Sequence, residues 1–273
     1  MLVIALFVGV AMILAPLIKQ EYELNSGASR YIDLKQSVST TEPVAKPQPT
    51  VTPVIAKPAE EQIPQVSPSV SPSQPSSQVQ DNAVDFATCL SINQDFIGWI
   101  TIPGTPVDYP VVQTDNVQHY LTHTFAGEKN KIGTLFTLGK TDLITPSQNI
   151  AIYGHHMRKT RAQTMFEPLH NYKKAEYYHQ HPTIEFNTIY HSGTYTIFAA
   201  CNMRATEWDP SLTSFSDPMA FMHYIEMLRS RSFFDSSVEV NASDQLLTLI
   251  TCDRNYDSDD GRLIVLAVKN KKE

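Results

Sequence analysis

The sequence predicts a mainly β domain, built as a mainly antiparallel barrel or sandwich with a few added helices. Short runs rich in Val, Ile, Thr, Tyr and Phe recur through residues 84–272, and turn residues such as Pro103 and Gly104 separate them. Helical patterns are fewer and do not alternate regularly with these runs, which argues against a parallel α/β sheet. No internal repeat is present.

Residues 1–18 are predicted to form a transmembrane anchor, because they contain no charged side chain. A helix of this length spans roughly 27 Å, close to the thickness of the hydrocarbon core of a bilayer. A cleaved signal peptide is the alternative. The run is longer than the usual apolar region of about 7–15 residues in signal peptides, and no basic residue precedes it. We therefore expect a single-pass cell-membrane protein with its folded domain extracytoplasmic.

Residues 19–83 are predicted to be an extracytoplasmic linker rich in Pro and Ser. Half of the 18 prolines lie between Pro43 and Pro75, among Ser, Thr, Val and Gln. Chain of this composition cannot bury a core and favours extended polyproline II. Because it follows the anchor, we expect it to act as a stalk that holds the folded domain, residues 84–273, away from the bilayer.

The folded domain is expected to contain eight strands and four helical segments. Asp217 should cap the last helix, with proline at its first position. The strands are predicted at 98–102, 108–112, 134–138, 150–153, 183–187, 194–200, 246–251 and 263–268, and the helices at 84–95, 116–124, 165–178 and 218–230.

Charge and cysteine content narrow the function classes. The net charge of −7 argues against a nucleic-acid partner, since affinity for phosphate backbones comes mostly from clustered Lys and Arg. The three cysteines, Cys89, Cys201 and Cys252, leave at least one thiol unpaired within the chain. For Cys89 and Cys201 we favour two buried free thiols over a disulfide. Zinc-ligand spacing is missing, and the sequence suggests no metal or organic cofactor.

Cys252 follows a strongly β-prone run, residues 246–251, and precedes the polar segment 253–261. This places the thiol at the end of a strand, where it is held rigidly and can face a cleft. The alternative is a buried cysteine that serves only as a small hydrophobic residue.

His155 has a similar setting, because the apolar run 149–153 delivers Gly154, His155 and His156 into a loop. A surface histidine and a two-histidine metal site are the alternatives. Adjacent side chains in a strand point to opposite faces, so these histidines are poor partners for one metal. A free thiol is only about 3% ionised at pH 7. A positioned imidazole would raise its reactivity and protonate a leaving amine.

Arg262 begins the strand after Cys252, and it returns beside Cys252 if these strands pair in antiparallel fashion. A guanidinium there would stabilise the oxyanion formed on attack at a carbonyl; an ordinary strand-end cation is the alternative. The intervening loop is acidic. A calcium site or a carboxylate that orients His155 is the alternative to the solvated acidic loop that we favour. Its acidic residues are Asp253, Asp257, Asp259 and Asp260.

Together these motifs resemble the sortases, and class B sortases in particular. The resemblance is carried by the Thr-Leu-Ile-Thr-Cys run at 248–252, by Tyr153-Gly154-His155 and by Arg262. It extends over roughly residues 85–269. Further likeness lies in Phe-Ile-Gly-Trp-Ile at 96–100, Met-Phe-Glu-Pro-Leu at 165–169 and His-Pro-Thr-Ile-Glu-Phe at 181–186.

The resemblance implies an eight-stranded sortase β-barrel and a cysteine transpeptidase. Cys252 would cleave the C-terminal sorting motif of secreted proteins through a thioacyl enzyme. An amine of a peptidoglycan precursor or of a pilin would then accept the acyl group. His155 and Arg262 map onto the catalytic histidine and arginine of the family. One departure is Ile250, where class B members often have Ser.

Two other functions remain as alternatives. A cysteine peptidase would use the same residues with water as acceptor. An inactive, stalked binding module would need none of them, so the joint presence of Cys252, His155 and Arg262 argues against it.

Overall fold

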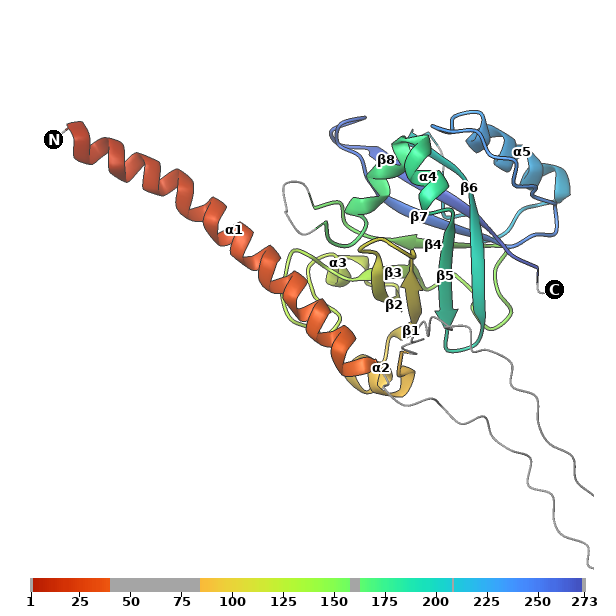
Figure 1. The fold of residues 1–273 in the computed structure, drawn as a ribbon, viewed down its shortest axis with the longest axis horizontal. Coiled ribbons are helices and arrows are strands. Elements are labelled where there is room, and N and C mark those ends of the chain that lie inside the picture. Colours follow the sequence, from red (N-terminus) through yellow and green to blue (C-terminus); the bar gives the residue numbers. More distant parts are fainter. Residues whose placement is uncertain (1, 40–83, 158–162, 208, 272–273) are drawn as a thin grey trace, which may run out of the picture.

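The structure, a computed structural model, describes residues 2–39, 84–157, 163–207 and 209–271. Eight strands form a closed barrel in the order β1-β2-β3-β4-β7-β8-β6-β5. A long N-terminal helix lies with its C-terminal half beside the barrel, and its N-terminal half projects away from it, as Figure 1 shows. The barrel confirms the predicted fold class.

All eight predicted strands are present, and β6 is the one that extends furthest beyond its predicted range. It runs through 13 residues because it pairs with both β5 and β8. The strands are β1 (Phe96–Thr101), β2 (Asp108–Thr114), β3 (Leu135–Leu138), β4 (Asn149–Tyr153), β5 (Thr183–Thr188), β6 (Ser192–Arg204), β7 (Leu246–Cys252) and β8 (Gly261–Lys269).

Two of the eight strand pairs are parallel, β2 with β3 and β4 with β7, and the other six are antiparallel. The β4–β7 register runs from Asn149 opposite Leu246 to Tyr153 opposite Ile250. Parallel strands end at the same edge of a sheet, so the segments that follow β4 and β7 emerge side by side.

The helices α2 (Phe86–Ile92), α3 (Val117–Tyr120) and α5 (Pro218–Arg229) lie within their predicted ranges. The Asp217 carboxylate accepts a hydrogen bond from the Ala220 N–H at 2.8 Å, which confirms the predicted cap of α5.

The single helix predicted at 165–178 is wrong, because two short helices occupy this segment. A 3₁₀ helix, η1 (Glu167–Lys173), precedes α4 (Ala175–Gln180). Lys174 separates them with an extended backbone, at φ −112° and ψ 124°.

The barrel interior forms the main core, and a second core lies between α5 and the outer face of β6, β7 and β8. Strands β7 and β8 are therefore buried on both faces, which explains their almost continuous apolar sequence. Cys89 lies in the first core and Cys201 in the second, both as buried free thiols, as predicted. Burial raises the pKa of each thiol to about 12.

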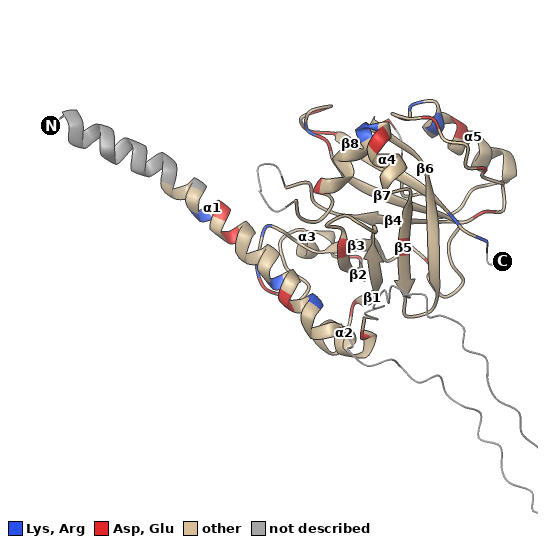
Figure 2. Cartoon of the chain, in the orientation of Figure 1, with Lys and Arg blue, Asp and Glu red and all other residues tan. Residues whose placement is uncertain are grey.

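Helix α1 (Leu2–Val38) continues far beyond the predicted anchor, so the expectation that the linker begins at residue 19 is wrong for 19–38. Its second half buries Leu24, Tyr31 and Val38 against the domain. Charged residues are interspersed along this half, as Figure 2 shows, and Arg30 and Lys35 form ion pairs with Glu128 and Asp108 of the domain. The spacing of these apolar residues is helical.

The predicted anchor depends on residues 1–14 and 17, which lie outside the residues whose side chains the structure describes. Within the portion that it does describe, none of the helices combines the length and the apolar character needed to cross a membrane.

The two ends of the proline-rich segment lie together. Ser39 forms an antiparallel bridge with Val84, and the Asp85 N–H donates to the Val38 carbonyl at 2.6 Å. The segment itself, 40–83, lies outside the described residues. The expectation that this segment is a stalk therefore stays a prediction, while its two flanking residues, Ser39 and Val84, are paired.

Candidate active site

Parallel pairing of β4 and β7 brings His155 and Cys252 to the same edge of the barrel. Past the last register pair, the Gly154 N–H donates to the Ile250 carbonyl at 3.1 Å. The Thr251 hydroxyl donates to the Gly154 carbonyl at 2.7 Å. His155 and Cys252 are the next residues of the two strands, and both are half-buried. The structure thus brings the two predicted segments together.

Glycine at 154 permits this close passage of the chain. A Cβ there would lie 2.3 Å from Leu135 Cδ2 and 2.6 Å from Phe166 Cδ2. Any side chain would displace the end of β4 from the barrel wall and, with it, the residue that follows.

The His155 ring is held by the segment between α3 and β3. Its Nε2 lies 2.8 Å from the Leu121 carbonyl oxygen, which only accepts hydrogen bonds, so Nε2 carries a proton. The ring also packs on Gly133, at φ +66°, where a Cβ would lie 2.9 Å from His155 Cδ2. In the neutral imidazole, Nδ1 is therefore the basic nitrogen.

The protonation of His155 follows from its surroundings. Burial lowers the pKa of His155, and the charge of Arg254 lowers it further, although the Leu121 hydrogen bond opposes both. At neutral pH the ring is thus a neutral base with a defined tautomer.

Arg262 faces Cys252 directly. The two residues are Cα partners at the end of the antiparallel β7–β8 pair, so their side chains lie on the same face of the sheet. One guanidinium nitrogen, Nη1, donates to the Gly261 carbonyl at 3.0 Å. This bond uses one of the guanidinium donors and orients the plane of the group. The predicted return of Arg262 beside Cys252 is confirmed.

Two histidines hold the main chain of Cys252. His156 Nδ1 and His170 Nε2 lie 3.2 and 3.1 Å from its carbonyl oxygen, and the two ring centroids are 3.8 Å apart. Both nitrogens must carry protons, because a carbonyl only accepts. Burial and the neighbouring His156 lower the pKa of His170 to about 4. Sequence reasoning gave His156 no role and missed His170.

Asp253 departs from the predicted solvated acidic loop. Its side chain is 0% exposed and forms an ion pair with Lys173 of η1. Burial raises the pKa of Asp253, but the Lys173 hydrogen bond and charge outweigh this and hold it below its usual range. The expected solvation of Asp253 is wrong, because the Lys173 ammonium group, and not water, contacts its carboxylate.

The remaining acidic residues bind within the loop and to β6. Asp257 accepts from the N–H groups of Asp259 and Asp260 and pairs with Arg204. Asp259 is exposed, as predicted. The described ranges hold no group of three or more His, Cys, Asp or Glu side chains that could bind a metal.

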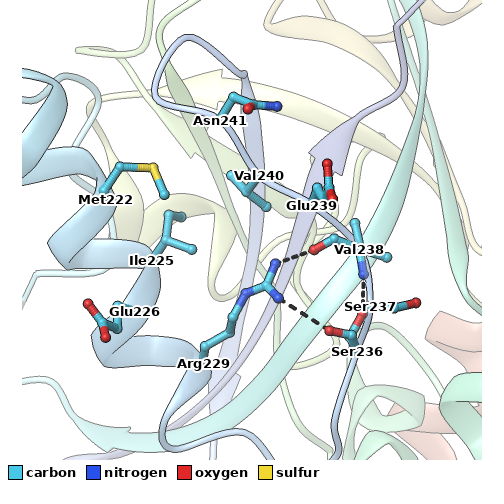
Figure 3. A pocket seen from close by; sticks show the side chains of 10 residues that line it. All are labelled: Met222, Ile225, Glu226, Arg229, Ser236, Ser237, Val238, Glu239, Val240 and Asn241. Atoms are coloured by element: carbon cyan, nitrogen blue, oxygen red, sulfur yellow. Dashed lines mark hydrogen bonds between the residues drawn. The ribbon is translucent and has the colours of Figure 1, made fainter.

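A pocket of about 460 Å³ lies between α5 and residues 236–241, as Figure 3 shows. Neither Cys252, His155 nor Arg262 lines it. Arg229 extends across it, and Nη1 and Nη2 donate to the carbonyls of Ser236 and Val238. The pocket is therefore separate from the candidate active site.

A family model described as the sortase domain matches residues 100–270, more than half of the chain. The chain belongs to the sortase family. Its matched span contains β4, β7 and β8, which carry the residues at the candidate site.

Curated relatives place this sortase beside class B members. Sortase B of Staphylococcus aureus is 31% identical over 183 residues, which cover 67% of this chain and 73% of the relative. Sortase B of Listeria monocytogenes is 29% identical over 190 residues, which cover 70% and 74%. The sortase is thus an enzyme of the cysteine transpeptidase type.

Solved structures agree with this placement. A Staphylococcus aureus sortase B–substrate complex matches with a TM-score of 0.63 and 30% identity, over 69% of this chain and 86% of the other. Clostridium perfringens sortase B matches with a TM-score of 0.62 and 30% identity, over 68% and 100%.

Proposed function

We propose that this sortase cleaves a C-terminal sorting motif of secreted proteins with Cys252 as nucleophile, His155 as acid and base, and Arg262 as oxyanion stabiliser. One observation carries the proposal. The pairing of β4, β7 and β8 puts these three residues at adjoining strand ends. A similar Staphylococcus aureus protein is described in complex with substrate.

In the first half-reaction, His155 Nδ1 takes the thiol proton and the Cys252 sulfur attacks the carbonyl carbon of the scissile amide. The oxygen gains the electron pair of the C=O bond and is stabilised by Arg262. Collapse of this intermediate breaks the C–N bond. His155 returns the proton to the leaving amine, and a thioester remains on Cys252.

In the second half-reaction, an acceptor amine attacks the thioester. The C–S bond breaks, a new amide forms, and the amine proton returns through His155 to the Cys252 sulfur. We propose a peptidoglycan precursor as the acceptor. A related sortase B is described in complex with triglycine, an amine-bearing peptide. A pilin lysine and water are the other acceptors to test.

For location, we propose a single-pass cell-membrane protein whose catalytic domain is extracytoplasmic. The charge-free run of residues 1–18 supports this placement. Fusion of a reporter to the C-terminus, with protease added to intact cells, tests it; a protected reporter contradicts it.

The test of the chemistry is mass spectrometry of the enzyme mixed with a library of sorting-motif peptides. We expect an acyl adduct on Cys252 that triglycine discharges quickly and water slowly. Cys252→Ala should form no adduct, and His155→Ala should lower its rate of formation sharply. An adduct that persists in Cys252→Ala refutes the proposed nucleophile, and discharge by water alone favours the peptidase.

A further inference from the structure

The backbone segment at Gly133, against which the His155 ring packs, is hydrogen-bonded to α1. Tyr31, from the second half of α1, is only 6% exposed. Its hydroxyl lies 2.7 Å from the Gly133 carbonyl oxygen, to which it donates, and it accepts from the Phe125 N–H at 3.1 Å. It also lies 3.1 Å from the Thr134 hydroxyl.

Gly133 connects the two contacts. Its carbonyl oxygen binds Tyr31, while its Cα packs against the His155 ring. The Thr134 N–H donates to the Tyr120 carbonyl at 2.9 Å, which places Leu121, the partner of His155 Nε2, beside Gly133. Tyr31 and His155 thus contact the same short stretch of backbone.

Other residues of α1 bind the same loop. The Asn130 amide donates to the Glu23 carbonyl at 2.8 Å, and Arg30 pairs with Glu128. Gly27 allows close approach, since a Cβ there would lie 2.9 Å from Ile132 Cγ2. Residues 123–134 therefore cannot move relative to α1 without breaking several contacts.

We infer that α1 is a positioning element for the active site, and that Tyr31 is the residue through which it fixes the orientation of His155. The inference rests on the proposed function only in the step from orientation to turnover. Loss of the Tyr31 hydroxyl removes the bonds to Gly133 and Phe125 while the ring stays against Tyr109. The loop then relaxes, and the Leu121 carbonyl no longer selects one imidazole tautomer.

The test compares Tyr31→Phe with Tyr22→Phe in the full chain. Tyr22 lies on the same helix and is 74% exposed, so the control loses the same hydroxyl without a buried contact. For Tyr31→Phe we expect kcat to fall by about tenfold, with KM within twofold, because a small misplacement of a catalytic group is costly. Tyr22→Phe should match the wild type.

Nitrogen NMR of the imidazoles gives a readout that does not depend on activity. The wild-type His155 ring should show the Nε2–H tautomer, and Tyr31→Phe a mixture of tautomers. Retention of the wild-type tautomer and kcat in folded Tyr31→Phe would overturn the inference. If Tyr31→Phe does not fold, Thr134→Val takes its place, because it removes the hydroxyl that contacts Tyr31 and binds the His123 carbonyl at 2.9 Å.

The two proposals fail in different ways. Full activity of His155→Ala would refute the proposed function, whereas the tautomer shift in Tyr31→Phe would still support the positioning inference. An inactive His155→Ala combined with an unchanged tautomer and kcat in Tyr31→Phe would refute the positioning inference alone.

Discussion

Cys252 and Arg262 are the last paired residues of β7 and β8, and they face each other across an antiparallel register. The intervening residues form a loop whose ends are joined by the Asp253 N–H, which donates to the Gly261 carbonyl at 2.8 Å. A guanidinium in this position is held by the sheet rather than by the loop.

Arg262→Ala should therefore lower kcat by about 10²–10³-fold, the usual cost of one lost oxyanion donor. Arg262→Lys should recover only part of this loss, because an ammonium lacks the planar donor pair. Arg231→Ala, at an exposed arginine, is the control. Turnover assays on sorting-motif peptides measure the effect, and wild-type turnover in Arg262→Ala would remove this residue from the mechanism.

The loss of activity at low pH should follow the protonation of His155. Burial, aided by Arg254, lowers the pKa of His155 below its usual 6.5, so the ring stays neutral and basic to lower pH than a free histidine. Activity should thus persist below pH 6.5 and be lost only as the pH falls through the lowered value. Arg254→Gln should move this loss to higher pH. A loss centred at or above pH 6.5 in the wild type contradicts the burial argument.

His170 should make the stability of the fold depend on pH. Its pKa is about 4 in the folded chain and 6.5 as a free side chain, so between these values the unfolded chain binds a proton that the folded chain does not. The free energy of unfolding should decrease as the pH falls through this window, by on the order of 1–2 kcal/mol after allowance for partial exposure. Urea titrations from pH 7 to 4 measure this.

The matching variant is His170→Gln, which keeps an N–H donor for the Cys252 carbonyl but does not titrate. It should flatten the pH dependence, whereas His179→Gln, at an exposed site on α4, should leave it unchanged. An equally steep dependence in His170→Gln would assign the effect to another group.

Lys173→Met should destabilise the fold, because it leaves the buried Asp253 carboxylate without its cation. We expect a loss of about 2–3 kcal/mol, less than for a fully buried pair since Lys173 is partly exposed. Lys174→Met, at an exposed neighbour, should change little. Adding Asp253→Asn to Lys173→Met should restore part of the loss; no recovery would show that the pair contributes little.

The sequence predicted the barrel and the return of Arg262 beside Cys252 well, because both depend on local pattern. The β-prone runs around Cys252 and Arg262 are almost continuously apolar, as expected for strands with a core on both faces. Because the two runs are consecutive and joined by a short loop, antiparallel pairing is the expected arrangement. Gly154 before His155 similarly marks a close passage at the end of β4.

The supporting contacts depend on distant parts of the chain and were not predictable in the same way. His170 and Lys173 lie in a segment whose helical pattern does not predict their contacts with Cys252 and Asp253. Tyr31 lies in the part of α1 that was predicted to be linker. The seven-residue spacing of Leu24, Tyr31 and Val38 could have indicated the buried face of a helix. No local pattern says which carbonyl a buried hydroxyl will reach.

The bridge between Ser39 and Val84 joins the two residues that flank the proline-rich segment. The length of segment 40–83 therefore does not set the distance between α1 and the active site, and shortening the segment should not move Cys252 relative to α1. A nick within 40–83 should yield two polypeptides that co-elute in gel filtration as one catalytically competent particle.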